Sequence, residues 1–407
     1  MSPNQHEADL VATGAIPPDD FHDSIERIAE VADYDLEIDA DLLTRLEAAT
    51  GNLLVSKSKL REIVAGLIVG HVVLQGPPGT GKSSLARAIA KAFNISLMPT
   101  TAHEEWSTFE VIGRQTIEIQ GDGKEAVVPV NGIFTEAVIR CAGSVSKHFD
   151  RPDEPQATWL LIDELNRAHA DRAFGELFSA LGSNEPVAIT LGFQKAGNQE
   201  LVTPRRFRII GTINSFDKQF VNGLSQALRR RFTFITIDVP EKRSANEAWV
   251  PVTASSSQAV REFAVVAKAA FARVERREQS PPEEVEALRN ELITKPNGLL
   301  ADLFELIEKV RYAGEGGEMP HLPIGTAQLI DTVELFITKA LLEKVPFDKL
   351  GGALDWAASV KLAPLFEADS VNPNSLKQLA RVLPSAFSPL FSRALLETAA
   401  AGLYHVG

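Results

Sequence analysis

The chain has 407 residues, which is enough for two or three domains that each bury a hydrophobic core. Its hydrophobic fraction of 44% and charged fraction of 23% are those of ordinary globular proteins, so composition excludes a fibrous or wholly disordered chain. The formal net charge of −13 argues against an electrostatic grip on nucleic acid by the whole protein, and the single Cys141 excludes an intramolecular disulfide framework.

Residues 1–50 are acidic and contain prolines, with one weak helical pattern over residues 19–32. They predict a partly ordered N-terminal segment that is too short to be an independent recognition domain. The first ten residues lack the basic-then-apolar layout of a secretion signal, and no apolar run approaches the length of a membrane span. The sequence therefore favours a cytoplasmic location, with no association with a membrane.

Residues 51–240 alternate helical patterns with short β-branched runs, which is typical of a parallel sheet covered by helices on both faces. The predicted fold class is α/β, with a five-stranded parallel sheet as the core of this region. The runs that predict the strands are residues 71–75, 95–99, 158–162, 207–213 and 232–237.

Residues 76–83 read Gly-Pro-Pro-Gly-Thr-Gly-Lys-Ser, between the first predicted strand and a helical pattern over residues 83–93. Glycines let backbone N–H groups converge on a phosphate at the start of a helix. Lys82 can then reach the β- and γ-phosphate oxygens, and the Ser83 hydroxyl can bind Mg²⁺. The pattern predicts a triphosphate site made of Gly76, Pro77, Pro78, Gly79, Thr80, Gly81, Lys82, Ser83 and Ser84.

Two segments interrupt the alternation of strands and helices. Residues 116–130 alternate apolar and polar residues about a Gly-Asp-Gly turn, which predicts a β-hairpin, and residues 187–204 resemble a second one. Because both lie outside the five-strand pattern, we expect them to project from the sheet. Each hairpin is either a surface embellishment or a docking element for a partner. An aromatic residue there either grips a polymer or belongs to the local core, and the aromatic residues are Trp106, Phe109 and Phe193.

The run LLIDELNRA at residues 160–168 is an apolar strand that ends in Asp163 and Glu164. Burying charge without a partner is costly, so two carboxylates at a strand tip indicate a function. In a nucleotide site, Asp163 would hold Mg²⁺ through water, and Glu164 would polarise the water that attacks the γ-phosphate. A helix N-cap explains one carboxylate at this point of the chain but not the pair.

The next apolar strand carries a neutral polar residue at its end, Asn214 in the run FRIIGTINSFDK. An amide there can orient a water molecule without competing for the metal. Asn at the end of a strand usually serves to form a turn. Here its position after the phosphate loop and the acidic pair favours the role in the nucleotide site.

Three consecutive arginines lie between a helix and the last strand, in the run LSQALRRRF at residues 224–232. They form either a basic helix terminus that complements the helix dipole or a finger that completes the nucleotide site of a neighbouring subunit. Another basic run, RRFR at residues 205–208, either has a specific function or simply forms a solvent-exposed basic edge. The three arginines are Arg229, Arg230 and Arg231.

From residue 241 onward the strand signals stop. Residues 280–284 read Ser-Pro-Pro-Glu-Glu, a helix start with a cap, proline in the first turn and acidic residues near the positive end. Residues 329–342 carry apolar residues along one helical face. Residues 241–407 are therefore predicted to be mostly α-helical, as a lid followed by a further helical extension.

The order of these motifs resembles the AAA+ ATPases, and within them the clade of the MoxR ATPases, the McrB restriction motors and the dynein-related midasins. The runs GPPGTGKSSLARAIA, IDELNRAHADRAFGELFSAL and NGIFTEAVIRCA carry the resemblance, together with the two hairpins, and it covers about residues 51–240. DELNRA and ALRRRF favour the McrB-like subgroup.

The resemblance implies an NTP hydrolase that uses ATP, or GTP, with Mg²⁺ and assembles into a ring, most often a hexamer. It implies that Lys82 and Ser83 form the Walker A motif and Asp163 and Glu164 the Walker B motif. Asn214 matches sensor 1, either Arg230 or Arg231 matches the arginine finger, and Arg167 is directed toward the subunit boundary. For McrB-like rings the resemblance implies a nuclease or another effector as partner, often in antiviral defence. For MoxR-like rings it implies a protein substrate, often one with a von Willebrand A domain. Nucleic acid would be reached through the partner or the central pore.

The sequence also departs from the McrB pattern. No segment is large enough for the N-terminal domain that reads modified DNA, and GTINSFDKQ differs from the corresponding McrB run, so a preference for GTP cannot be transferred. The usual sensor 2 arginine is missing, and residues 323–330 offer Thr326 and Gln328 instead. A nucleotide-gated scaffold with slow turnover and a MoxR-like chaperone remain alternatives, whereas a metabolic kinase does not need these later motifs.

Overall fold

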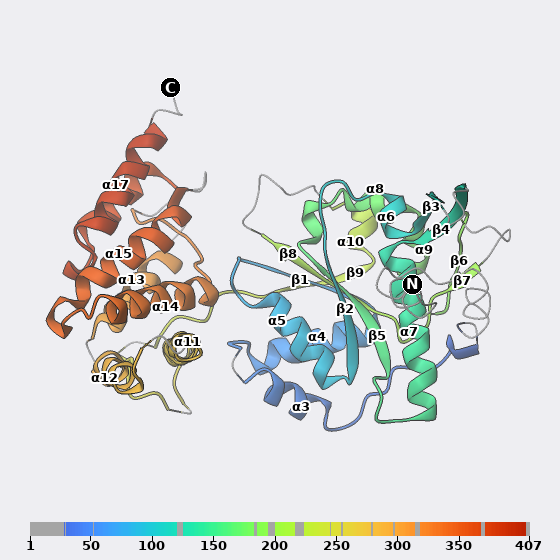
Figure 1. Cartoon of the computed structure of the whole chain (residues 1–407), viewed down its shortest axis with the longest axis horizontal. Coiled ribbons are helices and arrows are strands. Elements are labelled where there is room, and N and C mark those ends of the chain that lie inside the picture. Colours follow the sequence, from blue (N-terminus) through green and yellow to red (C-terminus); the bar gives the residue numbers. More distant parts are fainter. Residues whose placement is uncertain are drawn as a thin grey trace. The chain divides into compact units, whose positions relative to one another are not determined.

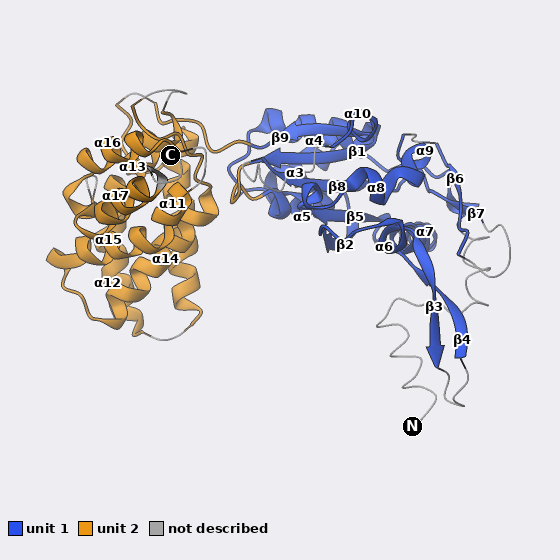
Figure 2. Cartoon of the chain, turned by 90° about the horizontal axis from the view of Figure 1, so that it is seen from above, with its two compact units in different colours: residues 1–76, 82–237 blue, residues 77–81, 238–407 orange. Residues whose placement is uncertain are grey.

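The computed structural model describes residues 28–403, apart from residues 29, 52, 120–124, 183–184, 194–199, 216–223, 245, 254, 278–279, 296–297, 314–317 and 368–370. The chain divides into two compact units (Figure 2). Unit 1 comprises residues 1–76 and 82–237, and unit 2 comprises residues 77–81 and 238–407. The phosphate loop is thus grouped with unit 2, although β1 and α5 on either side of it belong to unit 1.

The sheet of unit 1 has five parallel strands in the order β2–β5–β8–β1–β9 (Figure 1). The strands are nearly continuous runs of buried apolar residues, as expected for a sheet packed on both faces. All five predicted strands are confirmed, with their ends displaced by one or two residues. They are β1 (His71–Gly76), β2 (Ile95–Thr101), β5 (Ala157–Asp163), β8 (Ile209–Asn214) and β9 (Phe232–Thr236).

The register of the sheet brings the motifs to one edge. Parallel strands end on the same side, and Gly76 at the end of β1 is the register partner of Asn214 at the end of β8. Asp163 ends β5, the other neighbour of β8. The phosphate loop, the acidic pair and the asparagine therefore follow three adjacent strands.

Helices pack on this sheet, with α7 along β5, α4 against β1 and α5 against β2. Residues before the predicted core also take part, because α3 packs against α5 and buries Leu42 and Leu46 completely. The helices of unit 1 are α3 (Leu42–Ala49), α4 (Lys57–Val69), α5 (Lys82–Ala92), α6 (Thr108–Val111), α7 (Ile133–Asp150), α8 (Ala170–Phe174), α9 (Phe178–Leu181) and α10 (Gln226–Arg229), with 3-10 turns η1 (Leu165–Arg167) and η2 (Gly175–Leu177).

Both predicted hairpins are confirmed as antiparallel ribbons outside the main sheet. The first consists of β3 (Gly113–Ile119) and β4 (Glu125–Asn131), and the second of β6 (Ala188–Thr190) and β7 (Glu200–Val202). The β3–β4 ribbon extends away from the sheet (Figure 2). Its predicted Gly-Asp-Gly turn lies outside the described residues.

The aromatic residues beside the hairpins have different roles. Trp106 is buried in the core against Phe174. Phe193 lies on Gly113 at the base of the first hairpin, where an added Cβ would come within 2.5 Å of the ring. Gln115 Nε2 also donates to the Phe193 carbonyl oxygen at 2.9 Å, so Phe193 joins the two hairpins. Phe109 remains exposed.

The basic run at residues 205–208 has an intramolecular task. Arg206 Nη2 donates to Glu37 Oε1 at 2.8 Å, and Arg208 donates to main-chain oxygens that include that of Leu67 at 2.7 Å. Partial burial raises the pKa of Glu37, but hydrogen bonds from Arg206 and His148 outweigh it and leave that pKa below its usual value. The run thus links the acidic N-terminal segment to the sheet.

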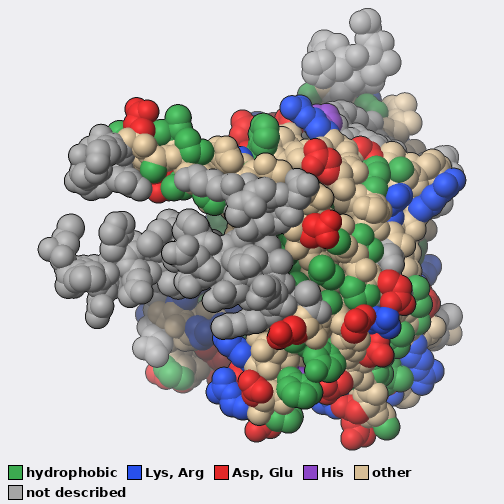
Figure 3. All heavy atoms as spheres, turned by 90° about the vertical axis from the view of Figure 1, so that its right-hand side faces the viewer, with side chains coloured by type: hydrophobic (Ala, Val, Ile, Leu, Met, Phe, Trp, Pro, Cys, Tyr) green, Lys and Arg blue, Asp and Glu red, His purple; other side chains and the backbone are tan. Residues whose placement is uncertain are grey.

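On the face of the molecule seen in Figure 3, basic and acidic side chains are interspersed.

Unit 2 is helical, which confirms the prediction for the second half of the chain. Its core contains a buried ion pair, in which Arg311 Nη1 and Nη2 donate to the two carboxylate oxygens of Glu262 at 2.5 and 2.9 Å. Its helices are α11 (Gln258–Glu275), α12 (Pro282–Ile293), α13 (Leu299–Arg311), α14 (Thr326–Leu342), α15 (Leu350–Lys361), α16 (Pro373–Arg381) and α17 (Leu390–Leu403), with 3-10 turns η4 (Phe347–Lys349), η5 (Ala363–Glu367) and η6 (Ser385–Phe387).

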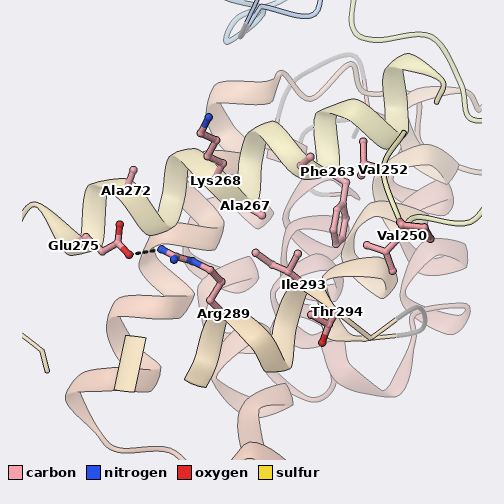
Figure 4. Close-up of a pocket in the computed structure, with 12 residues that line it drawn as sticks. Val250, Val252, Phe263, Ala267, Lys268, Ala272, Glu275, Arg289, Ile293 and Thr294 are labelled. Atoms are coloured by element: carbon pink, nitrogen blue, oxygen red, sulfur yellow. Dashed lines mark hydrogen bonds and ion pairs between the residues drawn. The ribbon is translucent and has the colours of Figure 1, made fainter. Parts of the chain in front are cut away.

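A mostly apolar cavity of about 860 Å³ lies between α11 and α12. Figure 4 shows the ion pair of Glu275 and Arg289 toward one end and Phe263 with Val250 toward the other. The Arg289 guanidinium also lies 5.0 Å from the centre of the Phe271 ring, which keeps this cation at the cavity wall.

The last helix of unit 2 is capped by a carboxylate from another helix. Asp355 on α15 is buried and accepts hydrogen bonds from the main-chain N–H groups of Leu390 and Phe391 at 2.8 and 2.9 Å. We expect Asp355→Ala to destabilise the chain by about 2 kcal/mol, because two N–H groups lose their acceptor. Thermal unfolding of Asp355→Ala measures this loss, with the exposed Asp348→Ala as the matched control. Equal melting temperatures for the two variants would contradict the capping role.

Candidate nucleotide site

The phosphate loop turns sharply at glycines that no other residue could replace without strain. Gly76 has φ +154°, and an added Cβ would lie 2.0 Å from the Ile237 carbonyl oxygen. Gly79 has φ +75°, and an added Cβ would lie 2.0 Å from Gln328 Oε1. Both positions therefore favour glycine through their positive φ, and Gly76 is required in addition by the close approach of the Ile237 main chain.

Within unit 2, the loop lies against the start of α14. The Ala327 N–H donates to the Gly79 carbonyl oxygen at 3.0 Å, and an added Cβ at Gly325 would come within 2.3 Å of the Pro78 carbonyl oxygen. The two residues suggested in place of sensor 2 diverge. Thr326 Oγ1 donates to the buried Glu262 Oε1 at 2.6 Å, whereas Gln328 lies against the phosphate loop.

Lys82 begins α5 with its side chain turned inward. It is only 9% exposed, and its ammonium group donates to the Gly76 carbonyl oxygen at 2.9 Å. Among the predicted loop residues, Thr80 Oγ1 donates to the Pro77 carbonyl oxygen at 3.0 Å and stiffens the turn, and Ser84 is exposed on α5.

The carboxylate of Asp163 joins α5, β5 and β8. Ser83 Oγ donates to Asp163 Oδ1 at 2.6 Å, and Thr212 Oγ1 donates to the same oxygen at 3.0 Å. Thr212 Oγ1 in turn accepts the main-chain N–H of Glu164 at 3.0 Å. The predicted metal ligands Ser83 and Asp163 are therefore in direct contact, and Thr212 is a member of the network that the sequence patterns did not single out.

Glu164 has an unusual backbone for a residue with a side chain, with φ +58° and ψ +42°. Its carboxylate Oε2 lies 2.7 Å from Nε of Arg167 in η1, and both side chains are partly exposed. Residues held in the left-handed region cluster at functional sites, where the surrounding structure over-determines them. Here the Thr212 hydroxyl accepts a hydrogen bond from the main-chain N–H of Glu164, and the Arg167 guanidinium contacts its carboxylate, so both the backbone and the side chain are held in place.

Asn214 ends β8, and its carbonyl oxygen accepts a hydrogen bond from Asn166 Nδ2 at 3.5 Å. Asn166 is 2% exposed, and the sequence patterns gave no reason to select it. Only its place two residues after Glu164, between the buried Leu165 and Ala168, could have drawn attention to it. The structure thus brings Asp163, Glu164, Asn166 and Asn214 to the carboxyl edge of two neighbouring strands.

The three consecutive arginines face different surroundings. Arg229 lies on Phe234, with its guanidinium carbon 5.8 Å from the ring centre. Arg231 packs on Phe178 at 4.6 Å, and its Nε donates to the Phe178 carbonyl oxygen at 2.6 Å. Arg230 is exposed, and its side chain has no partner among the described residues.

Residues 71–232 match the family model described as AAA domain (dynein-related subfamily). This match supports an AAA+ ATPase of that clade, on the α/β phosphate-loop fold described above. It covers the subfamily as a whole, so the McrB-like subgroup remains a prediction.

Two curated proteins are similar to parts of the chain. The ATP-dependent zinc metalloprotease FtsH of Hahella chejuensis is 32% identical over 92 residues, which are 22% of this chain and 15% of FtsH. The denitrification regulatory protein NirQ of Stutzerimonas stutzeri is 25% identical over 184 residues, which are 44% of this chain and 57% of NirQ. The chain therefore spans less than two thirds of the length of each relative. Over its described residues, none of its helices combines the length and apolarity of a bilayer span.

Proposed function

We propose that the chain is a ring-forming ATP hydrolase that couples nucleotide turnover to the remodelling or translocation of a partner. The main support is the contact of Ser83 with Asp163, which joins the helix after the phosphate loop to the acidic end of β5. Glu164 follows Asp163 directly, at the place where an attacking water would be polarised. The match to the AAA domain and the ATP dependence in the name of FtsH favour ATP over GTP.

Each residue of the network has a role in this proposal. The loop residues would bind the phosphates through their N–H groups, and Lys82 would exchange its bond to the Gly76 oxygen for one to the phosphates. Glu164 would accept a proton from water that the Asn214 amide orients.

Ser83 and Asp163 would hold Mg²⁺, which neutralises charge on the phosphates when it is bound. Their oxygens are hard donors 2.6 Å apart, and a site with few protein oxygens suits Mg²⁺, because this ion usually completes its shell with water and substrate phosphates.

We propose a ring because a cation from a neighbouring subunit would complete the nucleotide site. Phosphoryl transfer is accelerated by a cation opposite the developing charge, and Arg230 is the arginine of its triplet whose side chain has no partner among the described residues. A neighbouring subunit would supply Arg230 in trans. We propose a homo-oligomer, most simply a hexamer, that acts on a partner effector.

For the biological role, we propose the McrB-like motor of a restriction or antiviral defence system with a nuclease partner, on the strength of the motifs DELNRA and ALRRRF. The similarity to NirQ, a regulatory protein, favours a second candidate, a MoxR-like ATPase that remodels another protein. A pull-down with each type of partner in the presence of ATP separates the two.

Steady-state hydrolysis of ATP and GTP over a range of protein concentrations tests the ring. If a neighbouring subunit completes the site, the turnover per chain should rise with protein concentration and then level off. A turnover per chain that stays constant over this range and is insensitive to Arg230→Ala would contradict it.

Thr212→Val tests the hydroxyl that joins Asp163 to Glu164. The substitution keeps the shape of a β-branched residue and removes both hydrogen bonds, so kcat should fall about 10-fold, equivalent to about 1.4 kcal/mol. The exposed Thr233 on β9 offers a matched control, Thr233→Val, which should keep the wild-type kcat. Equal rates for the two variants would remove Thr212 from the proposed network.

A further inference from the structure

Asn166 carries a buried hydrogen-bonding group without a partner in the part of the chain that the structure describes. Its carbonyl Oδ1 is shielded from solvent and has no donor among the described residues. Its Nδ2 donates to the Asn214 carbonyl oxygen at 3.5 Å, a bond at the long limit. Reversing the amide would set two carbonyl oxygens against each other, so the bond to Asn214 fixes which atom is the orphan.

Stability does not explain an amide at this position. Asn166 itself is only 2% exposed, and Leu165 before it and Ala168 just after the turn are buried apolar residues, so a leucine would suit position 166. A buried acceptor without a donor lowers stability, whereas replacing a weakly bonded polar group by an apolar one of similar shape is neutral or stabilising.

The position of Asn166 connects the two strands that carry the proposed hydrolytic residues. The turn η1 lies directly on β8, because an added Cβ at Gly211 would be only 3.2 Å from Leu165 Cδ2. Asn166 thereby reaches the end of β8 from a turn that begins one residue after Glu164. A displacement of either strand end must change the contact between Asn166 and Asn214.

We propose that Asn166 is a positioning residue for hydrolysis, a role that rests on the proposed function. Its Nδ2 ties the turn after Glu164 to the main chain of Asn214, and its Oδ1 gains a donor, a water molecule, when the site holds nucleotide. The residue thus sets the separation between the proton acceptor and the amide that orients the attacking water. It contributes to the rate and lowers the stability of the nucleotide-free protein.

The test compares Asn166→Leu with the wild type as full-length chains, using Mg²⁺ and ATP. We expect kcat to fall about 10- to 100-fold, because small errors in placing a reacting group have effects of this size. The Kd for ATP should stay within about 3-fold, since Asn166 is not among the loop residues. The melting temperature should remain at the wild-type value or rise by about 2–4 °C. Asn290→Leu, at an exposed position of α12, makes the same chemical change as a control and should keep the wild-type kcat.

Asn166→Asp provides a second arm, because it keeps acceptor oxygens but loses the donor to the Asn214 carbonyl oxygen. It should also lose turnover and keep the Kd for ATP. An Asn166→Leu variant with the wild-type kcat, or one that melts several degrees lower, would overturn the inference, since the amide would then be dispensable or simply structural. A wild-type chain that hydrolyses neither nucleotide would instead refute the proposed function.

Discussion

Glu164→Gln is expected to abolish hydrolysis while nucleotide binding is retained. The substitution keeps the size of the side chain but removes its ability to accept a proton from water, and a general base contributes about 10²- to 10⁴-fold to a rate. The network of Ser83, Asp163 and Thr212 is untouched, because Glu164 enters it through its main-chain N–H. Steady-state turnover and equilibrium binding of ATP, measured on the same preparation, check both halves of this prediction.

The matched control is Glu176→Gln, the same change at an exposed position of η2, which should keep the wild-type kcat. In saturating ATP, Glu164→Gln should accumulate as a stable oligomer, and a monomer under these conditions would contradict the ring. The variant also separates a motor from a scaffold. A scaffold locked in its ATP state should still engage its partner and support its activity, whereas a motor should stall.

Most of the fold follows from features that a sequence displays locally. The strands β1, β5 and β8 are near-continuous apolar runs, and such runs separated by helical patterns produce a parallel sheet. Once the sheet is parallel, all carboxyl ends share one edge, so motifs that follow separate strands must meet there. The contact between Ser83 and Asp163 is a consequence of this rule together with the strand order.

The features that the sequence did not predict are contacts between residues that lie far apart along the chain. The Arg206 side chain pairs with Glu37, 169 residues earlier, and no local pattern links the two. The left-handed backbone of Glu164 and the burial of Asn166 depend on the neighbouring strand β8, whose residues Thr212 and Asn214 contact them. Thr212 looked like an ordinary strand residue because threonine favours strands, and only the structure gives its hydroxyl two partners.

For the arginine triplet, too, the sequence does not tell which of the three side chains is engaged within its own chain. Helix α10 ends at Arg229, and successive side chains at a helix end point in different directions. Two of the three therefore reach aromatic rings of their own chain, Phe234 and Phe178. The sequence left either Arg230 or Arg231 as the candidate arginine finger. Because Arg231 is engaged by Phe178 of its own chain, Arg230 is the better candidate.

Arg230→Ala is accordingly expected to lower the turnover of the assembled protein by about 10³-fold or more, the effect of removing an arginine that stabilises transferring phosphate. Its exposed side chain contacts no partner in the part of the chain that the structure describes, so the melting temperature should not change. Arg231→Ala should show the opposite pattern. Its free energy of unfolding should fall by about 1–2 kcal/mol, because the contacts to Phe178 are lost, whereas its turnover should fall much less than that of Arg230→Ala.

A mixing experiment decides whether Arg230 acts in trans. Arg230→Ala keeps its own phosphate loop, and Lys82→Ala keeps its own arginine, so in mixed rings some boundaries pair an intact loop with an intact Arg230. Turnover should therefore reappear when the two inactive variants are combined. Arg172→Ala, which removes another exposed arginine of unit 1, serves as the charge control and should keep the wild-type rate. Mixtures that stay inactive although both variants assemble with wild-type chains would exclude a shared site, because a finger in trans requires that the two chains complement each other.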